Sequence, residues 1–478
     1  MSGEASIWTA AEAEAATGGR SSRDWRASGV SIDTRTLKPG DLFVALKATR
    51  DGHEFVVDAL ARGAVAALVS RKPDGVPADA ALLVADDVDR ALAALAAAAR
   101  ARIMGRVVAV TGSVGKTTTK EMLRAALFGQ GATHAAEGSL NNQWGVPLSL
   151  ARMPRTTQFA VFEIGMNHAG EIEPLTRLVR PDVAIVTAVE PVHMEFFASL
   201  EAVAEAKAEI FAGLTAGNGT AVVNGDSPFY PLLAKRAHER RAKRVLAFGT
   251  GTDAWARLLT ATPDAGGEGL SVETTIGDKA VAFRLPVPAR HWAMNALAAL
   301  TAVSAIGADV PRAAQALGDM APPEGRGRRH DVATVDGYFT LLDESYNASP
   351  AAMRAAFATA GAVPTGPGGR RIAVLGDMLE LGQGAERFHA ELAPALAASG
   401  FDLVLTAGPL MDALHRALPT ALRNTHAARA DDLVPVLRGL VRSGDVVVIK
   451  GSHGMGMHRI VAALVADAAK TQSAVNGN

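Results

Sequence analysis

VVAVTGSVGKTTTKEML, residues 107 to 123, joins an apolar run to a glycine loop that ends in Gly115, Lys116 and Thr117, followed by a helical pattern. Strand, glycines, lysine, hydroxyl residue and helix in this order are typical of a phosphate cradle, because loop N–H groups and the helix N-terminus face the anion. The standard P-loop has a further glycine where Val110 stands here. The stretch therefore predicts a nucleotide site of variant form. The alternative is a glycine turn that merely links a strand to a helix.

Within this loop, Lys116 would reach the outer phosphates and the Thr117 hydroxyl would ligate magnesium. The predicted cradle consists of Gly112, Ser113, Val114, Gly115, Lys116, Thr117 and Thr118.

The composition is that of an ordinary globular protein: 478 residues, 49% apolar, 20% charged, a formal net charge of -1 and no cysteine. Without a basic excess, nucleic acid is not an expected partner. The lack of cysteine excludes disulfides, thiol nucleophiles and cysteine metal sites. The acidic N-terminus, MSGEASIWTAAEAEAATGG, lacks signal-peptide features, and no uncharged apolar run is long enough for a membrane helix. We expect a soluble, cytoplasmic protein, a monomer without membrane insertion.

The apolar runs indicate three α/β units. Runs such as DLFVAL and ALLVAD alternate with helix-like segments up to residue 103. From 104 to 320, runs such as FAVFE and DVAIVTAVE predict a mainly parallel sheet with helices on both faces. After the Pro/Gly-rich APPEGRGRR, the runs RIAVLGDM, FDLVLTAG and DVVVIKGS predict a Rossmann-like unit. The expected domains are therefore residues 1–103, 104–320 and 321–478.

Two side chains with metal-binding chemistry follow strand runs of the second unit. Glu163 ends FAVFE, and His193 follows DVAIVTAVE within PVHMEFF. In a parallel sheet, the carboxyl ends of strands form the ligand-binding edge, so both residues are candidate magnesium ligands. The alternatives are an edge or capping carboxylate for Glu163 and a solvated loop histidine for His193.

Lys207 lies on the apolar stripe of a helix predicted over SLEAVAEAKAEIF. Its neighbours one turn away are Val203, Ala204, Ile210 and Phe211, none of which is acidic. Snorkelling to solvent is one explanation. A desolvated, catalytic or chemically modified amine is the other.

Further polar residues follow apolar runs elsewhere. Asn295, in HWAMNALAAL, could contact a base edge or cap the helix. LLDESYNASP, 341–350, is either a site or a turn rich in Asx hydrogen bonds. In the first unit, Thr34, Arg35 and Lys47 lie near strand ends, where they could hold a pyrophosphate or be solvated.

Several motifs in a fixed order make the chain similar to the Mur ligase family over nearly its whole length. These motifs are SIDTRTLKPGDLFVAL with DGHEF, GSLNNQWGVPLSL, EIGMNHAGEI, DESYNASP, and VLGDMLELG with KGSHGMGM. The short loop TGSVGKTT resembles that family's own form of the P-loop, which accounts for Val110.

The resemblance implies an N-terminal domain that binds a UDP-sugar, a central ATPase domain, and a C-terminal domain that closes over ATP and brings the incoming amine. The implied activity is an ATP-dependent ligation in peptidoglycan precursor synthesis. It joins D-alanyl-D-alanine to UDP-N-acetylmuramoyl-tripeptide through an acyl phosphate.

The resemblance also implies roles for single residues. Thr117 and Glu163 would hold one magnesium ion, and His193 a second one supported by a carbamylated Lys207. The implied ligand contacts are Asn295 for adenine, Arg326 for phosphates, Glu344 for ribose, Asn141 and Asn142 for the muramoyl peptide, Thr34, Arg35 and Lys47 for the UDP-sugar, and Asp377, Lys450 and Ser452 for the amino-acid side.

Two positions depart from the family pattern. Glu344 follows Asp343 where a second aspartate is usual, which leaves open which of the two contacts ribose. His453 replaces an arginine usual after Lys-Gly-Ser.

Two other readings keep the nucleotide site. One is another Mur-type or a folylpolyglutamate-type amide ligase; the N-terminal unit argues against the folate type, because folate ligases lack that domain. The other is a P-loop ATPase that couples hydrolysis to movement or assembly.

Overall fold

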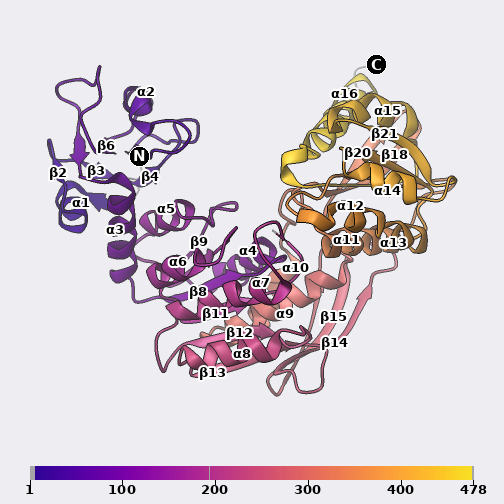
Figure 1. Cartoon of the computed structure of the whole chain (residues 1–478), viewed down its shortest axis with the longest axis horizontal. Helices are drawn as coiled ribbons and strands as arrows, with labels where there is room; N and C mark the ends of the chain where they lie inside the picture. Colours follow the sequence, from indigo (N-terminus) through magenta and orange to yellow (C-terminus); the bar gives the residue numbers. More distant parts are fainter. Residues whose placement is uncertain (1–5, 193, 476–478) are drawn as a thin grey trace.

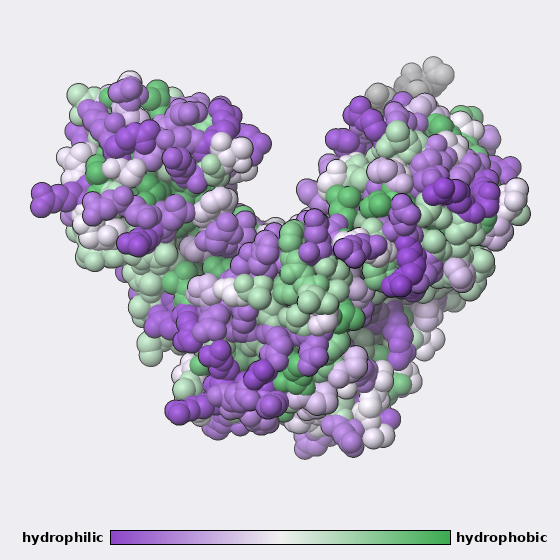
Figure 2. Space-filling view, in the orientation of Figure 1, coloured by the Kyte–Doolittle hydropathy of each residue, from purple (hydrophilic) through white to green (hydrophobic). Residues whose placement is uncertain are grey.

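The computed structural model describes residues 6–192 and 194–475, with side chains up to residue 467. Three α/β lobes follow one another along the chain (Figure 1). The central lobe forms a base, and the N-terminal and C-terminal lobes rise from it as two arms. Figure 2 shows a wide hollow between these arms. The expected three-part α/β architecture is confirmed, whereas the domain boundaries stay a prediction.

The N-terminal lobe is built on a five-stranded sheet in the order β2-β7-β6-β5-β4. The pairs from β4 to β7 are parallel and β2 is antiparallel. The strands are β2 (Arg20–Ser21), β4 (Gly29–Ser31), β5 (Asp41–Val44), β6 (Ala66–Val69) and β7 (Leu82–Val84), with a separate pair of β1 (Trp8–Thr9) and β3 (Arg26–Ala27). The helices are α1 (Ala10–Thr17), η1 (Gly52–Phe55), α2 (Val56–Ala61) and α3 (Val88–Ala101).

The central lobe contains a nine-stranded sheet in the order β16-β15-β14-β13-β12-β11-β8-β10-β9. Strands β8 to β14 pair in parallel, and two antiparallel strands extend the sheet beyond them. The strands are β8 (Arg106–Thr111), β9 (Thr133–Ala135), β10 (Phe159–Glu163), β11 (Val183–Val186), β12 (Thr220–Asn224), β13 (Arg244–Gly249), β14 (Ala256–Pro263), β15 (Leu270–Ile276) and β16 (Lys279–Leu285).

Helices cover both faces of this sheet, which explains why its strands are apolar on both sides. On β8, Val108 and Val110 enter one core, while Val107 and Ala109 enter the other. The first face carries α4 (Lys116–Phe128), α9 (Arg290–Ala305) and α10 (Val310–Gly318); the second carries α5 (Gly145–Ala151), α6 (Ile172–Val179), α7 (Leu200–Ala208), η2 (Glu209–Gly213) and α8 (Tyr230–Glu239).

The C-terminal lobe has a six-stranded sheet in the order β17-β18-β22-β19-β20-β21, with one antiparallel pair at its β17 edge. The strands are β17 (Arg328–Thr334), β18 (Gly337–Glu344), β19 (Arg371–Gly376), β20 (Leu403–Ala407), β21 (Arg423–Ala427) and β22 (Val446–Lys450). The helices are α11 (Pro350–Ala362), η3 (Gly382–Gly384), α12 (Ala385–Ala390), α13 (Ala393–Ala398), α14 (Met411–Ala417), η4 (Ala430–Asp432), α15 (Leu433–Leu440), η5 (His453–Met455) and α16 (His458–Val475).

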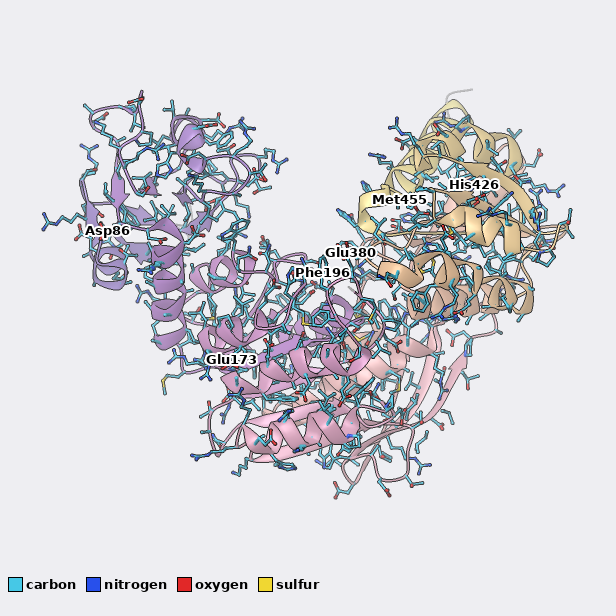
Figure 3. All side chains as sticks on the ribbon, in the orientation of Figure 1. Asp86, Glu173, Phe196, Glu380, His426 and Met455 are labelled. Atoms are coloured by element: carbon cyan, nitrogen blue, oxygen red, sulfur yellow. The ribbon has the colours of Figure 1, made fainter. Side chains whose placement is uncertain are left out.

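One of the contacts between the central and C-terminal lobes joins two loops. Figure 3 shows Phe196 and Glu380 close together at this junction. The Glu195 N–H donates to the Glu380 carbonyl at 3.4 Å. Across the part of the chain that the structure describes, no helix is both long and apolar enough to cross a bilayer.

Candidate active site

The glycine loop lies between the end of β8 and the start of α4, at the carboxyl edge of the central sheet. Gly112 has φ 151° and Gly115 has φ 83°, both positive. A Cβ on Gly112 would lie 1.9 Å from Thr187 Oγ1, and one on Gly115 would lie 2.5 Å from Asn295 Oδ1. Both glycines are therefore required by conformation and by space. The second contact also brings Asn295 of α9 against the loop.

Lys116 folds back over this loop. Its Nζ donates to the Gly112 carbonyl at 2.7 Å and to the Ser113 carbonyl at 3.3 Å. Burial lowers the pKa of the Lys116 ammonium, because desolvation disfavours the charged form. The Thr187 hydroxyl supports the loop from behind by donating to the Val114 carbonyl at 2.6 Å. The arrangement is a cradle with one cation at its mouth, which suits a polyphosphate.

Thr117 and Glu163 are in direct contact. The Thr117 hydroxyl donates to Glu163 Oε2 at 2.8 Å, and Asn141 Nδ2 donates to Glu163 Oε1 at 2.7 Å. Glu163 is 1% exposed. A hydroxyl and a carboxylate beside a phosphate cradle are oxygen donors of the kind magnesium prefers, so the residues fit this ion. Among the described residues, no three His, Cys, Asp or Glu side chains gather as a metal site.

Lys207 is buried at the end of α7, 2% exposed. Burial lowers the pKa of its amine well below the usual value, and the positive charge of Lys116 lowers it further. The structure therefore favours the desolvated amine over the snorkelling one. His193, the other candidate metal ligand of this region, lies outside the described residues.

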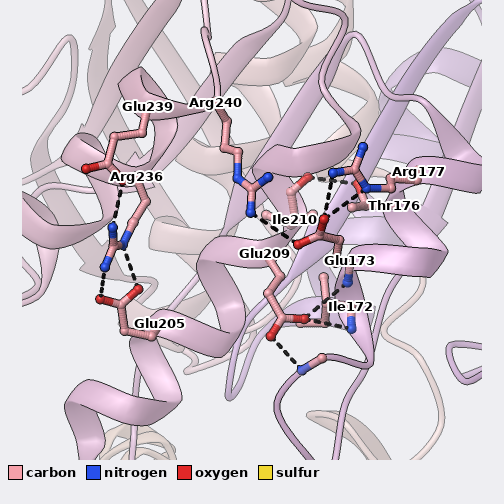
Figure 4. Close-up of polar contacts among 11 residues, drawn as sticks. Ile172, Glu173, Thr176, Arg177, Glu205, Glu209, Ile210, Arg236, Glu239 and Arg240 are labelled. Carbon is pink, nitrogen blue, oxygen red and sulfur yellow. Dashed lines mark hydrogen bonds and ion pairs between the residues drawn. The ribbon is translucent and has the colours of Figure 1, made fainter.

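A network of polar contacts fixes α7 against α6 and α8 (Figure 4). Glu209, two residues after Lys207, accepts from the N–H groups of Gly170, Ile172 and Glu173 at 2.6, 3.1 and 3.1 Å. This carboxylate caps the N-terminus of α6. Glu205 of α7 also forms a bidentate pair with Arg236 of α8. The C-terminal half of the helix that carries Lys207 is thus held against both α6 and α8.

A cavity of about 320 Å³ lies between the cradle, the start of α9 and the start of the C-terminal lobe. Its wall includes the cradle residues from Ser113 to Thr118 together with His291, Asn295, Arg326, Glu344, Tyr346 and Lys450. A more open hollow of about 1230 Å³ lies at the far edge of the sheet beside Trp255 and carries no comparable gathering of functional groups.

Glu344, rather than Asp343, faces this cavity. The Asp343 carboxylate instead accepts hydrogen bonds from nearby loop residues, from the Gly325 N–H at 3.0 Å and from the Ser345 hydroxyl at 2.5 Å. Glu344 is 8% exposed, and its Oε1 has no hydrogen-bond partner among the described residues. Its Oε2 lies 3.3 Å from Lys450 Nζ. A buried carboxylate oxygen without a hydrogen-bond partner costs free energy. Glu344 Oε1 is therefore available to accept a hydrogen bond from a ligand hydroxyl.

Tyr346 connects the C-terminal lobe to the central lobe. Its hydroxyl donates to Ser139 Oγ at 2.6 Å, and Ser139 Oγ lies 3.5 Å from the Thr117 hydroxyl. The Arg326 guanidinium lies 4.2 Å from the centre of the Tyr346 ring. The His453 ring, where an arginine is usual, lies 5.4 Å from the same ring.

The other expected substrate residues lie away from this cavity. Arg35 pairs with Asp33 and is exposed, Lys47 is exposed, and Thr34 is half-buried, all in the N-terminal arm. Asn142 is exposed, and its Oδ1 accepts from the Gly145 N–H at 2.9 Å. The structure does not bring these residues to the cradle.

Two of the three residues expected on the amino-acid side are engaged within the C-terminal lobe. Asp377 accepts from the Met411 N–H at 2.7 Å, and burial raises the pKa of its carboxyl. Ser452 Oγ accepts from the Leu379 N–H at 2.9 Å. Lys450 instead lines the cavity.

Sequence reasoning did not single out Ser139, Lys120 or His291. Ser139 precedes Asn141 in the motif GSLNNQW, so its place in that motif was the available signal. Lys120 directly follows the hydroxyl run of the cradle helix. Burial lowers the pKa of the His291 imidazole, and no sequence pattern marks that residue.

Three family models match consecutive parts of the chain. They are the Mur ligase family catalytic domain at residues 26–101, the Mur ligase middle domain at 110–303, and the Mur ligase glutamate ligase domain at 327–453.

Individual proteins match over most of the chain. The UDP-N-acetylmuramoyl-tripeptide–D-alanyl-D-alanine ligase of Escherichia coli is 38% identical over 439 residues, which are 91% of this chain and 93% of that protein. Crystal structures of MurF from Acinetobacter baumannii (27% identity, TM-score 0.81, 96% and 98% of the two chains) and of MurF from Thermotoga maritima with ADP (27%, 0.76, 93% and 98%) share the fold. A folylpolyglutamate synthase of Mycobacterium tuberculosis, 17% identical with TM-score 0.59 over 78% of this chain, is similar in fold alone.

Proposed function

The chain belongs to the Mur ligase family, and we propose that it joins D-alanyl-D-alanine to UDP-N-acetylmuramoyl-tripeptide at the expense of ATP. The products are UDP-N-acetylmuramoyl-pentapeptide, ADP and phosphate. The observation that carries the proposal is the match to a ligase of this activity, 38% identical over 91% of the chain and 93% of that protein.

The chemistry requires an activated acid, because a free carboxylate does not react with an amine at neutral pH. The terminal carboxylate of the tripeptide attacks the γ-phosphorus of ATP, forming an acyl phosphate and releasing ADP. The amine of D-alanyl-D-alanine then attacks the acyl carbon. The amide bond forms, phosphate leaves, and the amine nitrogen loses a proton.

In this scheme the glycine loop and Lys116 would bind the phosphates of ATP. The Lys116 Nζ, which now contacts two loop carbonyls, would turn to the outer phosphates and stabilise the negative charge that develops there. Arg326, at the cavity wall, would add a second cation. Asn295 would contact adenine and Glu344 a ribose hydroxyl.

Magnesium would be held by Thr117 and Glu163, and it would neutralise phosphate charge when bound. We propose a second magnesium near His193, supported by a carbamate on Lys207. Carbamate formation needs a neutral amine, and burial of Lys207 favours that form. Asn141 would orient Glu163 through the bond that the two already share.

Closure of the arms would complete the reaction chamber. The hollow of Figure 2 separates the N-terminal arm, proposed to hold the UDP end with Thr34, Arg35 and Lys47, from the C-terminal arm. Asn141 and Asn142 would meet the muramoyl peptide, and Asp377, Lys450 and Ser452 would belong to the dipeptide side. Closure would exclude water, which otherwise hydrolyses the acyl phosphate.

A matrix of substrates tests this function. UDP-muramoyl peptides of different lengths are combined with D-alanyl-D-alanine, D-alanine or glutamate, and phosphate release and product mass are measured. We expect a conjugate for the tripeptide with D-alanyl-D-alanine. A conjugate with glutamate alone would favour a folylpolyglutamate-type ligase, and ATP hydrolysis without acid or amine would favour a motor-type ATPase.

We also propose that the enzyme acts in the cytoplasm, where ATP and UDP-linked precursors are held, and that it acts as a monomer. Light scattering of the purified protein with and without substrates tests the second point, and a mass of twice the chain would contradict it.

A further inference from the structure

Lys120 is a fully buried cation outside the cavity described above. It lies on α4, one turn after Lys116, and is 0% exposed. A buried ammonium is costly unless its three N–H groups are satisfied. Lys120 Nζ lies 2.7 Å from the Ala136 carbonyl, 2.6 Å from the Gly138 carbonyl and 2.9 Å from Glu121 Oε1. All three donors therefore have partners.

Two of these partners, the carbonyls of Ala136 and Gly138, belong to one loop. This loop, residues 136–142, runs from the end of β9 toward α5 and contains Ser139, Asn141 and Asn142. It has no helix or strand of its own. Lys120 thus fixes the start of the loop to the helix that begins at the cradle.

The far part of the same loop contacts the groups of the site. Asn141 donates to Glu163, and the Asn141 carbonyl accepts from the Gly165 N–H at 2.8 Å. Ser139 lies between Thr117 and Tyr346. Displacement of the start of the loop would therefore move the contacts with both Glu163 and the C-terminal lobe.

Lys120 does not touch the space for the nucleotide. The cavity wall ends at Thr118 on α4. Burial raises the pKa of the Glu121 carboxyl, but its bonds to Lys120 and Arg124 outweigh burial and lower it. Neither Lys120 nor Glu121 lines that cavity, and the two carbonyl bonds join Lys120 to the loop.

We propose that Lys120 is a positioning residue for the acid substrate: its ammonium holds the loop 136–142 in the conformation that receives the muramoyl peptide. This inference rests on the proposed function. Its specific consequence is a larger effect on the muramoyl peptide than on the nucleotide itself, because no residue of the loop 136–142 lines the nucleotide cavity.

The test uses the full-length Lys120→Met variant, which keeps the length and apolar stem of the side chain. We expect KM for UDP-muramoyl tripeptide to rise by about tenfold or more, since each lost bond involves a charged donor. The Kd of ADP measured without magnesium, from titration calorimetry, should change by less than about twofold, because no residue of the loop lines the nucleotide cavity. Equal losses for both substrates, or no change for either, would overturn the proposal.

Hydrogen exchange separates a local effect from general destabilisation. In K120M, the amides of residues 137–143 should exchange about tenfold faster, while those of β8 and α9 keep their rates. Faster exchange throughout the central lobe would instead indicate a merely structural role and reject the positioning role.

A second variant covers the case in which K120M does not fold. Gly138 has φ 53°, and a Cβ there has nothing within 4 Å, so Gly138→Ala strains the carbonyl that Lys120 binds without a steric clash. Gly138→Ala should also raise KM for UDP-muramoyl tripeptide while leaving the affinity for ADP nearly unchanged. Glu121→Gln is the matched control, because its amide still accepts from Lys120, and its KM values should stay near those of the wild type.

The absence of cysteine allows a rescue experiment. Lys120→Cys, alkylated with bromoethylamine while unfolded and then refolded, regains an ammonium at this one position. We expect the KM for UDP-muramoyl tripeptide to recover toward the wild-type value. Failure of the refolded, alkylated protein to recover, while alkylated wild type keeps its activity, would count against the positioning role. Wild-type protein that makes no conjugate at all would reject the proposed function instead.

Discussion

The Tyr346 hydroxyl donates a 2.6 Å hydrogen bond to Ser139, across a separation of 207 residues in the chain. This bond ties the C-terminal lobe to the loop that also contacts Thr117 and, through Asn141, Glu163. The position of the C-terminal arm and the order of the proposed metal residues are therefore linked by a few side chains.

Tyr346→Phe removes this hydroxyl and keeps the ring beside Arg326. We expect kcat for ligation to fall by about tenfold, in proportion to the loss of one well-formed hydrogen bond. The Kd for magnesium-ADP should change less. Steady-state kinetics and calorimetry provide both values.

Tyr338→Phe is the control for this change, since Tyr338 lies on β18 of the same lobe and is 56% exposed. An unchanged kcat in Y346F would show that the bond between the lobes is irrelevant to turnover.

Lys116→Ala should abolish turnover of ATP, because it removes the one cation that already lies on the cradle carbonyls. A loss of about a thousandfold is expected for a charge that acts on the transferred phosphate. Phosphate release in the presence of both other substrates measures it. Lys72→Ala, at an exposed lysine of the N-terminal arm, should keep full turnover, and normal turnover in K116A would reject the cradle assignment.

Glu163→Gln should raise the magnesium concentration needed for half-maximal activity by about tenfold or more, because a neutral amide is a weaker ligand than a carboxylate. The hydrogen bond from Thr117 can persist in this variant, so the charge is tested separately from the packing. A magnesium titration of the ligation rate is the measurement. Glu239→Gln, at a surface ion pair of α8, serves as the control, and an identical titration curve for E163Q would remove Glu163 from the metal site.

Much of the fold could be predicted because its signals are local. The order of strand, glycines, Lys116 and helix is contained in seventeen consecutive residues, 107–123, and the structure has β8 and α4 there. The apolar stripe of Lys207 left open a snorkelling or a desolvated amine, and the structure, with Lys207 at 2% exposed, favours the second. The antiparallel strands β15 and β16 were not predicted, because they extend the sheet beyond the parallel pattern on which the prediction was based.

The contacts between distant segments could not be predicted in the same way. Asp343 and Glu344 are adjacent, and only the pairing of β18 decides that one serves a turn and the other the cavity. Lys120 looks like an ordinary helix lysine until β9 and its loop are placed beside α4. Such assignments depend on which distant segments pack together, and no local pattern in a single sequence shows this.

Lys207→Ala should reduce ligation by about a hundredfold or more if a carbamate on this residue supports a metal ion. Bicarbonate should not restore the variant, because no amine remains to accept carbon dioxide. Wild-type enzyme depleted of carbon dioxide should lose activity and regain it on addition of bicarbonate. Full activity in K207A would reject the carbamate, and a wild type indifferent to carbon dioxide would leave the amine itself as the functional group.

His134 predicts how stability depends on pH. This imidazole of β9 is half-buried, with Nε2 at 2.8 Å from the Ser149 carbonyl. Burial lowers its pKa from 6.5 to about 4. The folded state therefore prefers neutral His134. The free energy of unfolding has its full value above pH 6.5 and falls by up to about 3 kcal/mol as the pH drops toward 4, because the unfolded chain then binds a proton that the folded state does not.

Denaturant unfolding at several pH values should show a weaker dependence on pH in this range for His134→Gln than for the wild type. His238→Gln, at an exposed histidine of α8, should follow the wild-type curve. Parallel curves for the wild type and H134Q would contradict the assignment, because the proton that destabilises the fold would then bind elsewhere.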